Sequence, residues 1–355
     1  MTAATPWIVD AHLDLAWNAL GWNRDLREPV HVLRVREAAD AGPGRGRNTV
    51  ALPDLRRGGV RLCFATLLAR SSGVRRPHVD WDSTEQANAS ARGHLAYYRA
   101  LERGGHVTVL DDLAGLERHV TRVEAGEATP LGMVVAMEGA DPILAPDDVG
   151  AWAAYGLRLL GLAHYGPGRY AGGTGTDTGL TDLGCALLPL LPEAGVVLDL
   201  THLSDRAFWE ALELVDGPVH VSHGNCRALV PNQRQLDDEQ IRAVAARGGV
   251  IGVALDAWML EPGWVKGVSR PERVTLERVV DHIEHVCTVT GGVVAVGIGS
   301  DLDGGFGREQ SPGDLDTVAD MSRLAGLLAG RGFAPDEVDA VMHGNWLAFL
   351  RRCWG

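Results

Sequence analysis

Eight short, strongly apolar segments recur along this chain of 355 residues, and a helical pattern or a loop follows each one. Near-continuous runs of Val, Ile and Leu are typical of parallel strands that are buried on both faces of a sheet. Eight such units favour an α/β fold in the form of a closed (β/α)8 TIM barrel over an open doubly wound sheet. No Gly-x-Gly-x-x-Gly motif follows the first segment to support a dinucleotide-binding open sheet. The segments are residues 7–15, 60–68, 132–137, 157–162, 196–200, 219–222, 250–255 and 293–298.

The connections between these segments carry recognisable helix signals. Ser83 and Ser204 stand at expected helix N-caps, before patterns that extend to about residues 103 and 215, and a further helix is expected from near Asp237 to Ala246. A short additional strand is expected over residues 107–110. Residues 18–48 are rich in Arg, Gly and Pro and predict a long loop over the site after the first strand.

The carboxyl-terminal part of the chain is expected to be helical. Helical patterns over residues 315–329 and 335–351 predict a C-terminal helical extension of the barrel. A barrel of about 250 residues with insertions accounts for the whole length. Residues 1–355 are therefore expected to form a single domain.

Charge and cysteine content restrict the partners and the compartment. A formal net charge of −13 disfavours nucleic acid or an anionic membrane as a partner, because both need basic patches, and favours a small soluble substrate. Residues 1–6 lack a basic region followed by an apolar run, so no secretory signal is expected, and no segment is suited to span a bilayer. Scattered cysteines without a Cys-x-x-Cys spacing indicate reduced thiols and a cytoplasmic location. The cysteines are Cys63, Cys185, Cys226, Cys287 and Cys353.

The first apolar segment, residues 7–15, contains two candidate metal ligands. Side chains alternate faces along a strand, so His12 and Asp14 are expected on the same face. An imidazole and a carboxylate at this spacing suit a divalent transition metal. An isolated His-x-Asp is more often a surface or hydrogen-bonded pair, and the interpretation therefore depends on the rest of the chain.

Further candidate ligands follow the other predicted strands. Barrel enzymes place their catalytic groups at the carboxyl ends of the strands. Each residue alone has a structural alternative, such as a helix cap for Glu138, a core histidine for His202 or a turn carboxylate for Asp301. A metal centre explains their joint placement better than independent chance. His220 lies before a strand end and is expected to be structural. The candidates beyond the first strand are Glu138, His164, His202, His223 and Asp301.

Seven short motifs in this order make nearly the whole chain resemble the membrane dipeptidases. These are also called renal dipeptidases, or peptidase family M19, and belong to the binuclear-metal amidohydrolase superfamily. The resemblance implies an amidohydrolase-like barrel and hydrolysis of dipeptides. The motifs are residues 10–14 (DAHLD), 137–139 (MEG), 179–181 (GLT), 199–202 (DLTH), 221–229 (VSHGNCRAL), 299–304 (GSDLDG) and 344–346 (GNW).

The resemblance implies specific roles for the metal ligands. His12 and Asp14 would bind one Zn²⁺ and His202 and His223 a second, with other divalent ions open as the physiological metal. Glu138 would bridge the two ions. A bridging carboxylate implies metals about 3.5 to 4 Å apart, which share a water whose pKa falls toward about 7.

The resemblance also implies substrate contacts by His164 and Arg234. Members of the family usually have asparagine after this arginine, whereas Gln235 follows it here, and residues 166–179 cannot be matched one by one. These two departures affect the substrate preference and not the metal centre.

The hypothesis for the reaction assigns a task to each remaining group. The water shared by the two metals loses a proton to Asp301, and the resulting hydroxide attacks a peptide carbonyl polarised by one metal and by His164. Asp301 then delivers this proton to the leaving amine. Arg234 holds the terminal carboxylate of the dipeptide through a two-pronged ion pair, with a surface salt bridge as its alternative role.

Several alternatives remain open at the sequence level. The same centre could act on an N-acyl amino acid, a lactone or a phosphotriester, or the chain could be a non-catalytic metal-binding barrel. The sequence also leaves open the preferred side chains, a D-residue at the carboxyl-terminal position of the dipeptide, and assembly into a homodimer.

Overall fold

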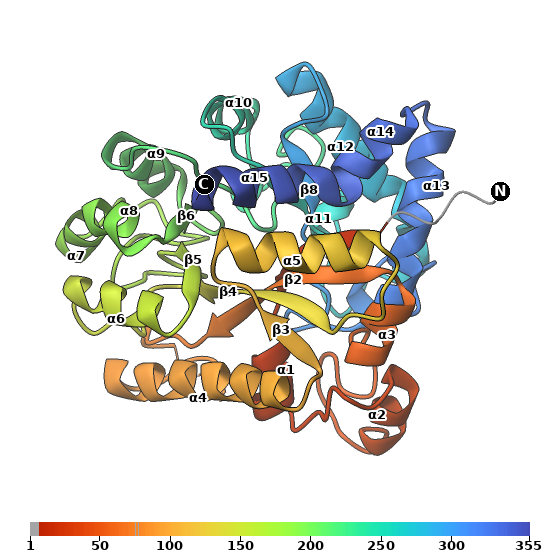
Figure 1. Ribbon diagram of the computed structural model, residues 1–355, viewed down its shortest axis with the longest axis horizontal. Coiled ribbons are helices and arrows are strands. Elements are labelled where there is room, and N and C mark those ends of the chain that lie inside the picture. The colour runs from red at the N-terminus through yellow and green to blue at the C-terminus, as the bar shows by residue number, and fades with distance from the viewer. Residues whose placement is uncertain (1–6, 75, 77) are drawn as a thin grey trace.

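The computed structural model describes residues 7–74, 76 and 78–355 as a parallel β-barrel surrounded by helices (Figure 1). The hydrogen-bonded order is β6-β5-β4-β2-β1-β8-β7, and every pairing is parallel. The predicted (β/α)8 architecture is thus confirmed. The strands are β1 (Ile8–Leu13), β2 (Val60–Leu68), β3 (Val107–Val109), β4 (Leu131–Glu138), β5 (Leu157–Gly161), β6 (Val197–Asp199), β7 (Ile251–Val253) and β8 (Val296–Ile298).

Residues 219–222 close the barrel between β6 and β7, although they do not form the regular strand that the sequence predicts. His220 bridges to Asp199 of β6, and Val221 bridges to Ile251 of β7, both in parallel. The amide of Ser222 donates to the side chains of Asp199 and Thr201, and therefore does not bond to the backbone of a neighbouring strand. The prediction of a strand was wrong in this respect because these polar side chains compete for the backbone.

The short strand β3 lies outside the ring. It pairs with the first residues of β4, from Leu131 to Met133, whereas β5 pairs with β4 from Val135 onward. The eight segments that form the barrel wall are therefore β1, β2, β4, β5, β6, residues 219–222, β7 and β8.

Helices cover the outside of the ring (Figure 1). The expected caps Ser83 and Ser204 are confirmed, because Ser83 accepts from the amide of Gln86 and Ser204 from that of Ala207. The helix expected near Asp237 has this residue as its N-cap, which accepts from the amide of Gln240. The helices are α1 (Leu15–Gly21), α2 (Val30–Arg36), α3 (Leu52–Arg57), α4 (Thr84–Arg103), α5 (Leu113–Glu124), α6 (Val149–Ala154), α7 (Asp182–Leu187), α8 (Leu191–Ala194), α9 (Asp205–Leu214), α10 (Asp238–Ala246), α11 (Ala257–Leu260), α12 (Leu276–Thr290), α13 (Arg323–Gly330), α14 (Pro335–Asp339) and α15 (Asn345–Trp354).

The segment after β1 is more ordered than the long loop that residues 18–48 predict. It contains the end of α1 and the whole of α2. Arg24 is buried and ties the segment together, because its Nε lies 2.7 Å from Glu37 Oε1 and its Nη1 lies 3.5 Å from Asp303 Oδ2. The prediction is confirmed for residues 22–29 and 37–48, which are irregular, and was wrong for residues 18–21 and 30–36, where packing and buried ion pairs stabilise helices that are too short to persist alone.

The C-terminal extension closes the amino end of the barrel, and its helical prediction is confirmed. Asn345 donates to the carbonyl of Val296 in β8, and Trp346 packs edge-on to Phe64 inside the ring, with ring centroids 5.1 Å apart. A side chain in place of Gly297 would approach the Trp346 ring to 2.4 Å, so the strand has no Cβ there. The opposite, carboxyl end of the barrel is left for the site.

Three expectations concern residues 1–6, the cysteines and membrane-spanning segments. Residues 1–6, where no secretory signal is expected, lie outside the described residues. All five cysteines are described and none forms a disulfide. Across residues 7–74, 76 and 78–355, no helix combines the length and the apolar character needed to cross a membrane.

Candidate metal centre and substrate cavity

The structure brings every predicted site residue to the carboxyl end of the barrel. The strand β1 ends at Leu13, so Asp14 does not continue it as expected but stands at the N-cap position before α1. Its side chain nevertheless lies near that of His12. Glu138 is the last residue of β4. The others follow strands: His164 follows β5, His202 follows β6, His223 and Arg234 follow residues 219–222, and Asp301 follows β8.

Glu138 lies at the centre of a cluster of imidazole nitrogens. Its Oε1 lies 3.2 Å from His202 Nε2 and 3.6 Å from His223 Nε2. Its Oε2 lies 3.7 Å from His12 Nε2, which is itself 3.9 Å from Asp14 Oδ2. The two carboxylate oxygens therefore face two different pairs of donors. This arrangement suits a carboxylate that bridges two cations.

Two buried atoms of this cluster have no hydrogen-bond partner within the described part of the chain. They are His12 Nε2 and Glu138 Oε2. Leaving a buried polar atom unpaired costs about 1–3 kcal/mol. A divalent cation among these nitrogen and oxygen donors would satisfy both atoms, so the residues fit a metal site.

The charge balance of the cluster also favours a cation. Burial holds the pKa of His202 and His223 well below the usual range, which leaves their rings neutral with free lone pairs. Burial raises the pKa of Glu138 and of Asp301. Burial alone would lower the pKa of His12, but the carboxylates led by Glu138 outweigh it and raise the pKa to about 10. Carboxylates thus attract positive charge to the centre.

Hydroxyl groups orient the rings of His202 and His223. Thr174 Oγ1 lies 2.9 Å from His202 Nδ1, and Ser222 Oγ lies 3.1 Å from His223 Nδ1. Each contact turns the Nε2 atom of its ring toward Glu138, as partners of ligating histidines commonly do. Thr174 belongs to the loop 166–179, which thereby acquires a structural role. The sequence analysis missed both hydroxyls because no motif or periodicity marks them.

Two residues of the cluster have a left-handed backbone conformation. The φ angle is 68° at His202 and 56° at Asp301. This conformation costs a non-glycine residue on the order of 1–3 kcal/mol and is concentrated at functional sites. The turn of Asp301 also needs Gly304, because a Cβ there would lie 1.9 Å from Asp301 Oδ1. Asp301 Oδ1 is consequently held 3.9 Å from His12 Nε2.

The cluster lies in a cavity of about 360 Å³. Arg234 lines it, is nearly buried, and donates through Nη2 to the carbonyl of His223 at 2.9 Å, while its Nε has no partner among the described residues. His164 lines the same cavity, with Nε2 3.6 Å from Glu138 Oε1. The other residues that line the cavity were not identified from the sequence, because single residues in loops show no recognisable spacing. These further lining residues include Trp17, Tyr165, Asp256, Met259 and Lys266.

Two polar residues near the cluster, His220 and Asp303, have structural roles. His220 lies in the barrel interior against the rings of Phe64, Trp346 and Phe349, away from the cluster, as expected of a structural histidine. Asp303 accepts hydrogen bonds from the amide and the hydroxyl of Thr49. Of the two carboxylates in the turn after β8, Asp303 stabilises the segment after β1 and Asp301 faces the cavity.

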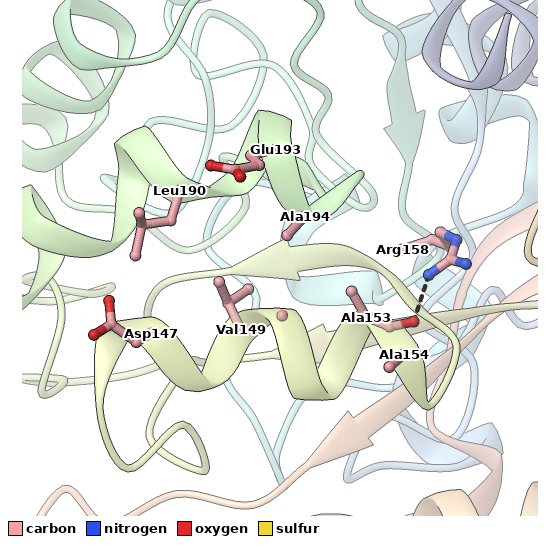
Figure 2. Close-up of a pocket in the computed structure, with 9 residues that line it drawn as sticks. Asp147, Val149, Ala153, Ala154, Arg158, Leu190, Glu193 and Ala194 are labelled. Carbon is pink, nitrogen blue, oxygen red and sulfur yellow. Dashed lines mark hydrogen bonds between the residues drawn. The ribbon is translucent and has the colours of Figure 1, made fainter.

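A larger hollow of about 530 Å³ lies on the outside of the barrel between α6 and α8 (Figure 2). Small apolar side chains such as Val149 and Ala153 form much of its wall. The guanidinium of Arg158 is turned to the backbone, donating to the carbonyl of Ala153 at 2.8 Å. None of the described His, Asp and Glu clusters that could hold a metal is located there.

Comparison with other proteins agrees with this geometry. A protein encoded in the pqqA 5' region of Klebsiella pneumoniae is 30% identical over 234 residues, which is 63% of this chain and 83% of that protein. Dipeptidase tcpJ of Claviceps purpurea is 29% identical over 203 residues, 55% of this chain and 44% of that protein. Dipeptidase 3 of Mus musculus is 30% identical over 175 residues, 49% of this chain. The chain thus spans less than half of the fungal protein and a third of the mouse protein.

Solved structures share the fold over nearly the full length. The crystal structure of dipeptidase AC, a family M19 metallopeptidase, has a TM-score of 0.80 at 24% identity and covers 99% of this chain and 100% of that one. A metallopeptidase from Rhodobacter sphaeroides, liganded with a phosphinate mimic of the dipeptide L-Ala-D-Ala, has a TM-score of 0.79 at 24% identity, with the same coverage. The family described as Membrane dipeptidase (Peptidase family M19) matches residues 3–353, and the chain therefore belongs to this family.

Proposed function

We propose that this protein is a metal-dependent dipeptidase with a centre of two divalent ions, zinc in the first place. The observation that carries the proposal is the position of Glu138, whose two oxygens face different donor groups near Asp301, a residue with a left-handed backbone. Membership in the family supports the reaction class. The free cysteines support a reducing, cytoplasmic setting.

The donors divide into two sets around the bridging carboxylate. His12 and Asp14 would hold one ion and His202 and His223 the other, with Glu138 shared. When bound, the ions supply a Lewis acid and lower the pKa of water to about 7. The neutral rings of His202 and His223 already have lone pairs available for this role.

Asp301 is the proposed general base and acid. It takes the proton of the attacking water and passes it to the leaving amine. Burial raises its pKa, which makes the carboxylate a stronger base than an exposed aspartate. The left-handed turn around it holds the side chain on the cavity side of β8.

The cavity walls supply the substrate contacts. Arg234 lines the cavity with a guanidinium whose Nε has no partner among the described residues, and it would bind the terminal carboxylate of a dipeptide. His164 would donate a hydrogen bond to the carbonyl oxygen of the scissile bond. A D-residue at the carboxyl-terminal position belongs to the proposal, because the structurally similar Rhodobacter sphaeroides enzyme binds a mimic of L-Ala-D-Ala.

A dipeptide library with L- and D-residues at both positions tests the proposal. The zinc-loaded protein should hydrolyse free dipeptides, lose activity on chelation and regain it with two ions per chain by elemental analysis. N-acyl amino acids, lactones and phosphotriesters form the comparison panel. Turnover of one of these in preference to every dipeptide would overturn the substrate class, and a fully metallated protein inert toward the whole panel would indicate a non-catalytic barrel.

A further inference from the structure

Arg70 is a buried arginine that contacts His164 from outside the cavity. It follows β2, and its side chain is only 4% exposed. Its Nη1 lies 2.6 Å from His164 Nδ1. This contact was not expected from the sequence, because 94 residues separate the two side chains.

The chemistry of arginine decides which ring nitrogen carries the proton. A guanidinium has five N–H donors, no acceptor, and stays protonated in proteins. His164 Nδ1 must therefore accept the hydrogen bond through its lone pair, which leaves the ring proton on Nε2. The Nε2 atom is the one that faces the cavity, 3.6 Å from Glu138 Oε1. We infer that Arg70 is a positioning residue that holds His164 as a fixed Nε2–H donor for the carbonyl oxygen of the substrate.

This tautomer excludes a different role for His164. Ligand atoms of Glu138, His164 and His202 lie within 4.8 Å of one another, a spacing that by itself would allow a metal ion among them. A ring nitrogen that carries a proton has no lone pair in the ring plane to give to a metal. His164 is thus a hydrogen-bond donor beside the metal centre and not one of its ligands.

Arg70 is itself fixed on several sides. Its Nη2 pairs with Asp80 Oδ2, and the other carboxylate oxygen of Asp80 accepts from the amide and hydroxyl of Ser72 at 3.1 and 2.6 Å. The backbone of Arg70 bonds to Val79 and Trp81, at 2.8 Å each. An ion pair of this kind holds the guanidinium in one orientation, which suits the positioning of a catalytic ring.

The inference rests on the proposed function, because it assumes that His164 contacts the substrate. Loss of the partner that orients a metal-ligating histidine costs about 10- to 100-fold in activity, and we expect a factor of the same size for His164, which needs its partner for orientation in the same way. Arg70→Met should lower kcat by this factor and change KM little, since the contact strengthens in the transition state. In a His164→Phe background the same change should cost nothing further, whereas a general loss of structure would lower kcat in both backgrounds.

Controls separate positioning from stability. Arg70→Lys keeps a cationic donor and should recover part of the loss. Arg169→Met removes an arginine from the adjacent loop that donates to the carbonyls of Ile143 and Leu144, and it should leave kcat unchanged. Arg70→Met combined with Asp80→Asn avoids an unpaired buried carboxylate if the single variant does not fold.

Histidine ¹⁵N NMR of the zinc-loaded wild-type protein reads the tautomer directly and needs no variant. The spectrum should assign the His164 proton to Nε2. A proton on Nδ1, or loss of metal from His164→Phe, would overturn the inference while leaving the dipeptidase proposal intact.

The activities of the variants separate the two proposals. Full activity of His164→Phe would show that His164 makes no essential substrate contact, which contradicts that part of the proposed function. If His164→Phe is nearly inactive but Arg70→Met keeps the full kcat, only the positioning role of Arg70 is overturned.

Discussion

The outer hollow between α6 and α8 and the cavity at the carboxyl end of the barrel differ in a way that volume does not predict. The outer hollow is the larger, at about 530 Å³ against about 360 Å³. The arginine that lines it, Arg158, donates to the backbone (Figure 2), and the carboxylates Asp147 and Glu193 are exposed. The barrel cavity instead holds buried polar atoms around Glu138, some of which have no partner in the part of the chain that the structure describes.

The difference teaches that convergent, unsatisfied polar atoms identify a site where volume does not. Folding hides polar groups at a cost that is normally offset by hydrogen bonds. The barrel leaves His12 Nε2 and Glu138 Oε2 without a partner in the described residues, and two residues there have a left-handed backbone. Such costs persist where function requires them.

The largest expected effect concerns the bridging carboxylate. Glu138→Gln replaces a charge that would balance two cations by a neutral amide, so bound metal should be lost together with activity. We expect kcat/KM to fall at least about 10⁴-fold, since enzymes accelerate reactions by 10⁶-fold or more. Metal content and kcat/KM are measured on the same preparation. Retention of two ions with high activity would contradict the bridge.

Asp301→Asn should separate proton transfer from metal binding. The amide keeps the shape of the side chain but cannot accept the proton, so kcat should fall about 10²- to 10⁴-fold while the metals stay bound. Elemental analysis, the thermal midpoint and kcat together test this. If Asp301 only shaped the turn, the thermal midpoint would fall and kcat at saturating substrate would stay near that of the wild type.

Arg234→Met should weaken substrate binding by a smaller amount. Loss of one partner of a buried charge pair costs about 2–4 kcal/mol, which is about 30- to 1,000-fold in kcat/KM for free dipeptides. A dipeptide with a carboxamide in place of its carboxylate should lose most of this energy already in the wild type. Equal turnover of free and capped dipeptides by the wild type would remove Arg234 from this role.

The smallest effect is expected in the outer hollow. Glu193→Gln changes an exposed side chain of α8 that lines this hollow. Surface substitutions of this kind usually change stability by less than about 0.5 kcal/mol, and kcat should not change. A marked loss of dipeptide hydrolysis in this variant would give the outer hollow a role and break the contrast between the two regions.

The sequence predicted the regular parts of the barrel better than its irregular parts. The strand β2 and the helix caps Ser83 and Ser204 follow from local signals, an apolar run and a side-chain acceptor before a helix. The helical pieces within residues 18–48 were not predicted, because they depend on tertiary contacts such as the buried ion pair of Arg24 and Glu37. Residues 219–222 were predicted as a regular strand but do not form one, because the amide of Ser222 donates to side chains and not to a neighbouring strand.

The sequence by itself determined the ring of parallel strands and the residue types that end them, because burial on two faces requires apolar runs and parallel strands share one carboxyl edge. Only the tertiary structure decided how those residues face each other. The position of Glu138 between the imidazoles, the hydroxyl of Thr174 on His202 and the guanidinium of Arg70 on His164 are contacts between different connections of the barrel. Such contacts depend on the packing of distant segments, and no local periodicity or spacing encodes them.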